Sequence, residues 1–324
     1  MKRREFITLA GGLTMWPLAV QGQKPAKTWR LGYVGTGGLG DQLFGEFTKK
    51  LESLGYVEAK SIFVARSIVP PDAKTIEAAV AKLLSEIDIL VIWGTVGGVV
   101  AKRLSQTTPT VFLSVGAPVD IGLVQSLSHP GGNMTGVSFE AAIDTYAKRL
   151  QMLKEIVPAL RTIAVLAAEG DPNVTFAMRS LEQAASGMHL ELTTIYVTTA
   201  DDLPAAFDQI RQANVDGLIV IAGLLTSINA KTIAELSLAH RLPNCHGFRE
   251  TVVAGGLISL GPDLFAIARQ GAVYVDRIIR GAKPADLPVE QPDRYEIYIN
   301  LKTAKVLGLE IPAYLLAGAD KVIE

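Results

Sequence analysis

The stretch that decides the fold is RLGYVGTGGLGDQLFGEF, residues 30–47, in which a short apolar run leads through a glycine-rich loop into an amphipathic segment. This order predicts a buried strand over residues 30–34 and a helix that begins near Asp41. Similar apolar runs follow, and all but the last lead into a clear helical period. They are SIFVA at 61–65, DILVIW at 88–93 and PTVFLS at 109–114. Such alternation predicts a parallel sheet with helices on both faces.

A second series of the same kind begins near Arg161. Its predicted strands are TIAVLAA at 162–168, LELTTIYV at 190–197, DGLIVIA at 216–222 and LPNCHG at 242–247. Its predicted helices cover residues 174–186, 202–213 and 227–240. The repetition predicts a second lobe built like the first.

The segments between and after the two series indicate how the lobes are joined. SHPGGNMTGVSF, residues 128–139, is rich in turn residues, and a helix over 141–157 would carry the chain into the second lobe. Later segments at 255–284 and 297–301 suggest that the chain crosses back. Three crossings would make a hinge for rigid-body closure. The expected boundaries are 28–147 plus 250–283 for lobe 1 and 148–249 plus 284–324 for lobe 2.

The N-terminal 22 residues have the pattern of an export signal. Basic residues at 2–4 precede an apolar stretch at 6–20, which is too short to span a bilayer of roughly 30 Å. We expect cleavage after Gly22. The run KRREF also has the twin-arginine form, so the Sec and twin-arginine routes both stay open. No cysteine lies near the cleavage point, which argues against a lipid anchor.

The composition excludes several other classes of protein. The chain has 324 residues, of which 49% are hydrophobic and 19% charged, enough for two globular lobes. Without the leader, 28 basic and 31 acidic residues give a net charge of −3, which does not favour nucleic-acid binding. The single cysteine, Cys245, excludes an intramolecular disulfide, and the clusters that a zinc site needs are absent from the sequence.

The motif GTGGLG, residues 35–40, satisfies the spacing of a dinucleotide-binding loop. That fingerprint also needs an acid after the second strand to hold the ribose, and this chain has Arg66 there. Because arginine could accommodate a 2′-phosphate, an exported NADP oxidoreductase is one alternative. The favoured interpretation is a loop that lets the first helix approach a bound solute.

Catalytic groups are scarce. His246, at the end of a predicted strand, is interpreted as a polar cleft residue, because no serine elbow or paired carboxylate accompanies it. Cys245 is interpreted as a small buried residue. The sequence therefore predicts a protein that is not an enzyme and holds no metal.

Small and polar residues follow the predicted strands of both series. In open parallel sheets, ligands bind beyond the carboxyl ends of the strands, where helices present free N–H groups. Two such edges facing each other would define a cleft. The predicted ligand-binding residues are Thr36, Gly37, Gly94, Thr95, Ser114, Ala117 and Asp120 in the first series, and Glu169, Asp171, Asn173, Gly223 and Phe248 in the second.

Several stretches resemble the TrpX-like family of ABC transporter substrate-binding proteins, which have the type I periplasmic-binding-protein fold. The resemblance covers essentially the whole chain. It rests on KRREFITLAGG, PTVFLSVGAPVDIGLVQSLSHPGGNMTGVS, KRLQMLKEIVPALRTIAVL, HRLPNCHGFRETVVAGGLISLGPDL, DRIIRGAKPADLPVEQP and INLKTAKVLGLEIP.

The resemblance implies a soluble periplasmic monomer without a cofactor, which captures a small organic solute and delivers it to a membrane permease coupled to an ATPase. Better-understood relatives bind aromatic amino acids. A sensor that presents its closed form to a signalling receptor is a second alternative, which the sequence does not discriminate.

The chain departs from the family pattern at two positions that bear on the ligand. Family members often carry Asp-Pro where this chain has Ala117 and Pro118, and Pro-Asp where it has Ala222 and Gly223. A buried ammonium group needs a carboxylate or several carbonyls. Asp120, Glu169 or Asp171 could substitute, so the expected ligand is an amino acid or an aromatic or aliphatic carboxylate without an amine.

Overall fold

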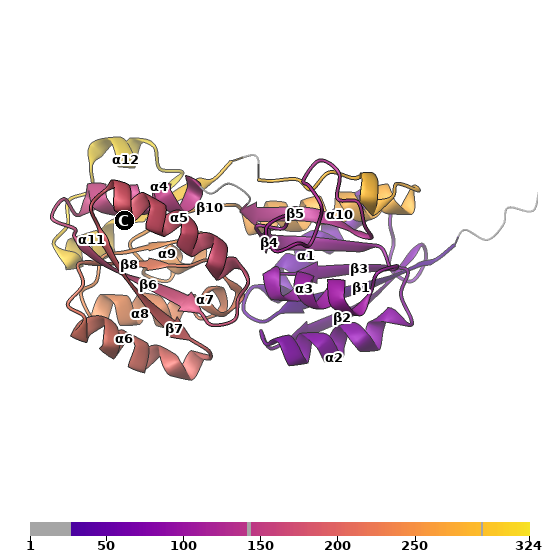
Figure 1. The fold of residues 1–324 in the computed structure, drawn as a ribbon. Coiled ribbons are helices and arrows are strands. Elements are labelled where there is room, and N and C mark those ends of the chain that lie inside the picture. The colour runs from indigo at the N-terminus through magenta and orange to yellow at the C-terminus, as the bar shows by residue number, and fades with distance from the viewer. Residues whose placement is uncertain (1–26, 141–143, 293) are drawn as a thin grey trace, which may run out of the picture.

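The computed structural model describes residues 27–140, 144–292 and 294–324, which form two α/β lobes side by side (Figure 1). The predicted export signal at 1–22 lies outside the described residues. In the part of the chain that is described, no helix is both long and apolar enough to cross a membrane.

Lobe 1 is built on a five-stranded sheet of order β2-β1-β3-β4-β5, and every pairing in it is parallel. The strands are β1 (Trp29–Thr36), β2 (Ile62–Val69), β3 (Ile89–Trp93), β4 (Thr110–Gly116) and β5 (Met134–Glu140). Strands β3, β4 and β5 are buried along their whole length, which explains their continuous apolar runs.

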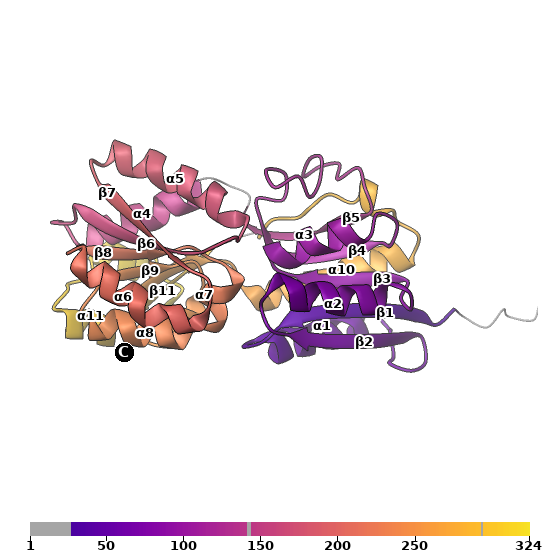
Figure 2. The same cartoon turned by 60° about the horizontal axis from the view of Figure 1, so that its bottom comes forward.

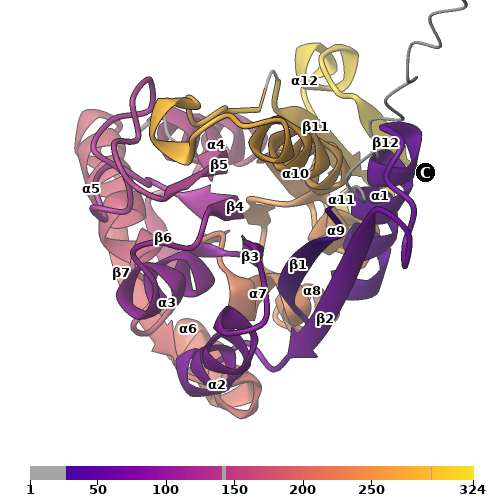
Figure 3. The same ribbon diagram turned by 90° about the vertical axis from the view of Figure 1, so that its right-hand side faces the viewer.

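Helices cover both faces of this sheet, as Figure 3 shows. They are α1 (Gly40–Ser53), α2 (Ala73–Leu84), α3 (Thr95–Leu104) and α10 (Leu264–Ile279), with a short turn η2 (Pro284–Asp286) beside β5. Helices α1 and α10 pack together on one face and α2 and α3 on the other. The two hydrophobic clusters of the lobe therefore lie on opposite sides of the sheet.

Lobe 2 is built on a seven-stranded sheet of order β12-β11-β10-β9-β8-β6-β7. The strands are β6 (Thr162–Ala168), β7 (Glu191–Val197), β8 (Gly217–Val220), β9 (Asn244–His246), β10 (Ile258–Gly261), β11 (Glu296–Asn300) and β12 (Lys321–Ile323). Only the pair of β10 and β11 is antiparallel among the described strands.

The helices of lobe 2 also lie on both faces of its sheet (Figure 2). They are α4 (Asp144–Ile156), α5 (Asn173–Gly187), η1 (Ala200–Asp202), α6 (Leu203–Gln212), α7 (Leu224–Ile228), α8 (Ala230–Ala239), α9 (Arg249–Val253), α11 (Leu301–Leu307) and α12 (Ala313–Ala317). The cluster under α4 and α5 and the cluster under α6 and α8 are separated by the sheet.

The chain passes between the lobes three times, which confirms the predicted three-crossing fold. It crosses after β5, after β10, and between Glu290, which bridges to Val137 of β5, and β11. Helix α10, orange in Figure 1, accordingly lies in the lobe whose other elements come from the first part of the chain.

The positions of the crossings differ from the expected boundaries. Residues 250–261, expected in lobe 1, form α9 and β10 of lobe 2, because Ile258 of β10 pairs in parallel with Cys245 of β9. Residues 284–290, expected in lobe 2, run beside β5 in lobe 1.

Two local predictions were wrong. The turn-rich segment 128–139 contains strand β5, and a Cβ at Gly136 would lie only 1.9 Å from the Phe112 carbonyl oxygen. Glycine at this position permits the close approach of β5 to β4, so here it belongs to a strand. The helix predicted over 227–240 is two helices, α7 and α8, which meet at Asn229.

A buried ion pair joins two of the crossings. Arg149 of α4 lies 3.3 Å from the carboxylate of Glu140, at the end of β5, and both side chains are fully buried. Arg149 also donates from Nε to the Leu260 carbonyl oxygen of β10, at 2.9 Å. Tyr295 on the third crossing donates to the Phe139 carbonyl oxygen, at 3.0 Å. The three connections are thus linked by polar contacts.

Candidate ligand-binding site

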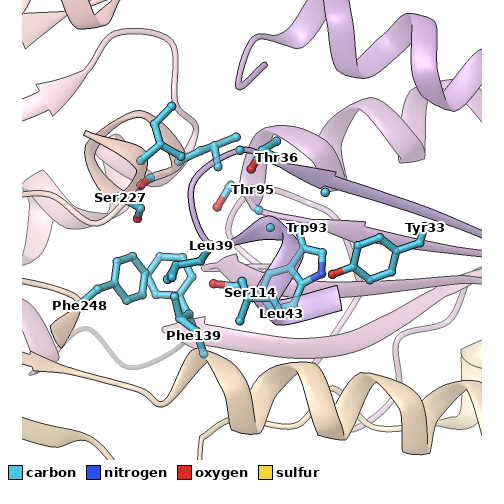
Figure 4. A pocket seen from close by; sticks show the side chains of 18 residues that line it. Tyr33, Thr36, Leu39, Leu43, Trp93, Thr95, Ser114, Phe139, Ser227 and Phe248 are labelled. Carbon is cyan, nitrogen blue, oxygen red and sulfur yellow. Dashed lines mark hydrogen bonds between the residues drawn. The ribbon is translucent and has the colours of Figure 1, made fainter. Parts of the chain in front are cut away.

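A cavity lies between the lobes, beyond the carboxyl ends of β1 and β3. Both lobes contribute to its wall (Figure 4). The lining residues from lobe 1 are Tyr33, Gly35, Thr36, Gly37, Leu39, Gly40, Leu43, Trp93, Gly94, Thr95, Ser114, Phe139 and Leu264. Those from lobe 2 are Gly223, Leu224, Ser227, Ile228 and Phe248.

Two helices of lobe 1 begin at the cavity. Helix α1 starts at Gly40 and helix α3 at Thr95, so their free N–H groups and positive dipole ends face this region. The residue before α3, Gly94, has φ 78°, a left-handed conformation that favours glycine. The sequence thus places backbone donors, rather than charged side chains, at the rim of lobe 1.

Ser114 is held in a strained backbone conformation at the cavity wall. Its φ is 55°, and the register between β4 and β5 shifts at this point. Such irregularities re-aim a side chain, and non-glycine residues at positive φ cluster at functional sites. The strain marks Ser114 as a residue whose position matters.

The rest of the wall is mainly apolar and aromatic. Phe139 of lobe 1 and Phe248 of lobe 2 have ring centroids 5.5 Å apart, and in Figure 4 Phe248 lies at the opposite end of the site from Tyr33. The lining includes no Asp, Glu, Lys, Arg or His among the described residues. The cavity therefore suits a ring system better than a densely charged molecule.

Direct contacts hold the lobes together around the cavity. A Cβ at Gly38 would lie 3.4 Å from Ile228 Cγ2, and one at Gly116 would lie 2.2 Å from the Asn173 side-chain oxygen. Asp120 of lobe 1 and Arg179 of α5 form an ion pair at 3.4 Å. The structure is therefore a closed form, in which both rims meet.

The family model described as "ABC transporter substrate binding protein" matches residues 40–323. The chain belongs to this family. The match covers lobe 1 from the start of α1, nearly all of lobe 2 and all three crossings, in agreement with the resemblance found in the sequence.

Individual proteins similar to this substrate-binding protein are consistent with the family assignment. A tyrosine-binding protein from Clostridioides difficile is 25% identical over 265 residues, 82% of this chain and 76% of the relative. The structure of an ABC domain from Streptococcus pneumonia in complex with L-Trp has a TM-score of 0.85, at 22% identity, over 92% of this chain and all of that one. A ligand-free, open substrate-binding protein from Clostridium difficile gives 0.66, at 22% identity, over 91% and 99%. The matched structures establish the fold.

The structure brings seven of the twelve predicted ligand-binding residues to the cavity of this substrate-binding protein. They are Thr36, Gly37, Gly94, Thr95, Ser114, Gly223 and Phe248. Thr95 is partly engaged, because its Oγ1 accepts from the Gly116 N–H at 3.1 Å. The other five lie outside the lining and have other contacts.

Three of these five lie at contacts between the lobes. Asp120 pairs with Arg179, as described above. Asn173 is buried at the start of α5, where it donates to the Ala222 carbonyl oxygen at 2.9 Å and to the Tyr146 hydroxyl at 3.2 Å. Ala117 is a third, since it is buried against the lobe 2 core.

The two predicted acids of lobe 2 lie behind the wall. Glu169 accepts from the Thr198 hydroxyl at 3.0 Å in an exposed position. Asp171 accepts from the Asn173 N–H at 2.9 Å, and burial raises the pKa of its carboxyl to about 6. Its second oxygen would lie 2.7 Å from a Cβ at Gly223. Asp171 therefore lies beside Gly223 but is not itself a lining residue of the cavity.

The glycine-rich loop forms part of the cavity wall. Gly35, Gly37 and Gly40 line it, while Gly38, at φ 75°, faces Ile228 of lobe 2. Arg66, the residue considered for a 2′-phosphate, forms an ion pair with Asp41 in the first turn of α1. The loop therefore lies at the cavity and beside lobe 2, while the approach of helix α1 to a bound solute stays a prediction.

His246 and Cys245 are buried in lobe 2. The Nε2 atom of His246 lies 2.7 Å from the Asn244 side-chain oxygen, and burial lowers the pKa of the imidazole to about 3. Burial raises the pKa of the Cys245 thiol to about 12. Both groups are therefore neutral at pH 7. Among the described residues no cluster of three or more His, Cys, Asp and Glu could hold a metal ion.

Sequence reasoning missed the ring side chains of the cavity, chiefly Tyr33, Trp93 and Phe139. Each lies in a strand that was predicted, or in the segment taken as a linker. The only signal was periodicity, since Tyr33 and Trp93 alternate with residues of the opposite face. A period of two cannot say which face leads to a cavity.

Proposed function

We propose that this chain is the solute-capturing component of an ABC importer, exported to the periplasm, and that it binds a small aromatic carboxylate without an amine between its lobes. The observation that carries the proposal is the interlobe cavity, which combines aromatic walls, helix N-termini and hydroxyl groups with no ionised side chain among its lining residues.

The aromatic part of the proposal rests on the walls of the cavity. Trp93, Phe139 and Phe248 supply ring faces and edges that suit offset or edge-on stacking with a ligand ring. Two relatives are named for aromatic amino acids, which is consistent with a ring-binding site.

The carboxylate part rests on the donors of lobe 1. A carboxylate near the starts of α1 and α3 would accept from backbone N–H groups and favour the positive dipole ends. The hydroxyls of Thr36, Thr95 and Ser227 lie on the same side of the site (Figure 4). These groups stabilise an anion without a buried counter-charge.

The exclusion of an amine rests on Gly223 and Asp171. An ammonium group enclosed by closure must recover its lost hydration from acceptors, and a carboxylate does so best. Asp171, a buried acid beside Gly223, does not line the cavity. Amine-free acids therefore have the smaller desolvation cost in this site.

Closure around the solute rests on the interlobe contacts. The contacts of Gly38 with Ile228 and of Gly116 with Asn173 exist only when the lobes meet. A ligand that touches both Phe139 and Phe248 binds the closed form better than the open one, and so shifts the population toward it. A permease could then recognise the closed shape.

The test uses the chain from residue 23 onward and matched ligand pairs: 3-phenylpropionate with phenylalanine, and indole-3-propionate with tryptophan. We expect the amine-free member of each pair to raise the melting temperature more and to bind at least about 10-fold tighter by calorimetry. Tighter binding of both amino acids would overturn the amine-free assignment. Failure of every aromatic acid would overturn the binding proposal, and tight binding of NADPH would support the oxidoreductase alternative.

Export is tested separately on the full chain. We expect periplasmic fractions to contain a shortened protein, and cytoplasmic retention of the full-length chain would contradict the proposal. Replacing Arg3 and Arg4 by lysine distinguishes the two routes, because only twin-arginine export should stop.

A further inference from the structure

Two polar side-chain atoms lie at the end of the cavity opposite Phe248. A ligand ring without a polar substituent would leave both without a hydrogen-bond partner. They are the hydroxyl of Tyr33 and the indole nitrogen of Trp93, from the neighbouring strands β1 and β3. Tyr33 is fully buried and Trp93 is 7% exposed. Both residues line the cavity, and both atoms lie where water has little access.

Neither atom has a hydrogen-bond partner among the residues that the structure describes. In Figure 4 the two atoms face each other. Trp93 acts on the pKa of Tyr33 as a weak hydrogen bond that opposes the larger effect of burial, but the pair does not reach hydrogen-bond geometry. The indole nitrogen can only donate, so a contact between them would use the Tyr33 oxygen as acceptor and leave the Tyr33 proton without one. At least one donor at this end of the cavity needs an acceptor from outside the chain.

The surroundings of the two donors are apolar. The two side chains pack with Leu31, Val91 and Leu113 in the apolar cluster under α1 and α10. Buried donors in such surroundings are almost always satisfied in native proteins. Burial also raises the pKa of Tyr33 above its usual range, so its phenol keeps the proton that it would donate.

We propose that the ligand is an aromatic acid whose ring carries an oxygen substituent, and that Tyr33 and Trp93 hold this oxygen. The inference rests on the proposed function. A ring hydroxyl accepts the Trp93 N–H and exchanges a hydrogen bond with Tyr33, while the carboxylate lies toward the starts of α1 and α3. Tyr33 and Trp93 are thereby specificity-determining residues, which select ligands by the far end of the ring.

The test compares ligands that differ only in this oxygen: 4-hydroxybenzoate with benzoate, and 3-(4-hydroxyphenyl)propionate with 3-phenylpropionate. We expect the hydroxylated member of at least one pair to bind at least about 10-fold tighter, because the unsubstituted ligand leaves buried donors unpaired. If both unsubstituted acids bind as tightly as their partners, the inference is wrong and the proposed function stands. If no acid of either pair binds, the proposed function itself fails.

Two conservative variants locate the effect. Tyr33→Phe and Trp93→Phe each remove a donor and keep a ring, so each should reduce the preference for the hydroxylated ligand to about three-fold or less. Each variant should lose more affinity for the hydroxylated acid than for the unsubstituted one, and an unchanged circular dichroism spectrum shows that the variant is folded. Unchanged preference in both variants would overturn the assignment of these residues.

Matched controls separate selection from packing. Tyr196→Phe alters an exposed tyrosine of β7, and Trp29→Phe alters a tryptophan at the start of β1 outside the cavity. Both should keep the full preference. Because Tyr33→Phe removes an unpaired hydroxyl, we expect its ligand-free melting temperature to be equal to or higher than that of the parent chain. A large decrease would indicate that the hydroxyl has a structural partner instead.

Discussion

The two lobes have similar layouts but contribute unequally to the site. Lobe 1 supplies thirteen of the eighteen lining residues, including the starts of α1 and α3, whereas lobe 2 supplies five from α7 and its neighbours. Helix α5, which follows β6 in lobe 2, contacts lobe 1 directly through Asn173 and Arg179. Equivalent strand ends can thus serve either the ligand or the closing contact. Lobe 1 thus forms most of the cavity wall, and lobe 2 closes over it.

The largest effect is expected at the hinge that both lobes share. Glu140→Gln leaves the guanidinium of Arg149 fully buried without a counter-charge, and should reduce the free energy of unfolding by about 3–5 kcal/mol. Urea denaturation at pH 7 measures it. Glu46→Gln, which removes a more exposed partner of Arg269, is the control and should change stability little. Equal stability of Glu140→Gln and the parent chain would show that the pair does not stabilise the hinge.

Truncating one lining residue in each lobe tests these unequal contributions to binding. Trp93→Ala should weaken binding about 100-fold, equivalent to about 2.7 kcal/mol, because it removes a buried ring from the lobe 1 wall of the cavity. Ile228→Ala should weaken binding only about five-fold, because it removes a few lining atoms of lobe 2. Calorimetry with the tightest aromatic acid measures both. Equal losses would mean that the lobes share the ligand evenly.

The buried carboxyl of Asp171 should make the stability of the protein depend on pH. Burial raises the pKa of Asp171 from 3.8 to about 6, so its ionisation costs the folded state increasing free energy as the pH rises through this range. Asp171→Asn should therefore add about 2 kcal/mol of stability at pH 7 relative to its effect at pH 4. Denaturation at the two pH values measures the difference, with the exposed Asp208→Asn as control. A gain that is the same at both pH values would contradict the assigned cost.

The smallest effect is expected at the exposed ion pair between the lobes. Arg179→Ala removes the partner of Asp120, and should weaken ligand binding about two-fold at low salt and less at high salt. Arg211→Ala removes a comparable pair within lobe 2 and should have no effect on binding. A much larger loss of ligand affinity for Arg179→Ala would mean that closure depends on this ion pair more than on the lining residues of lobe 1.

Most of the fold could be predicted from the sequence, because buried parallel strands are continuous apolar runs separated by helical periods. Strand β5 was missed, since Gly131, Gly132 and Gly136 resemble a turn, and the close contact of Gly136 with Phe112 is a tertiary fact. The order in which strands join a sheet is also tertiary, which is why residues 250–261 were assigned to the wrong lobe.

The site was predicted less completely than the fold. Strand ends and helix starts such as Thr36 and Thr95 could be located, because they follow from the order of the elements. Asp120 and Asn173 occupy equivalent positions, but the docking of the lobes directs them to each other's lobe instead of the cavity. Tyr33 and Trp93 could not be distinguished from core residues, because that depends on which face of β1 and β3 a cavity reaches.

The position of α10 has a consequence for how the chain is made. This helix packs against α1 in lobe 1, although more than 200 residues separate them in the sequence. Lobe 1 cannot complete its core until residue 279 has been synthesised, and the edge of lobe 2 waits for β12 at 321–323. Contacts of such long range slow folding. A nascent chain therefore cannot complete the core of either lobe until nearly all of its residues have been synthesised.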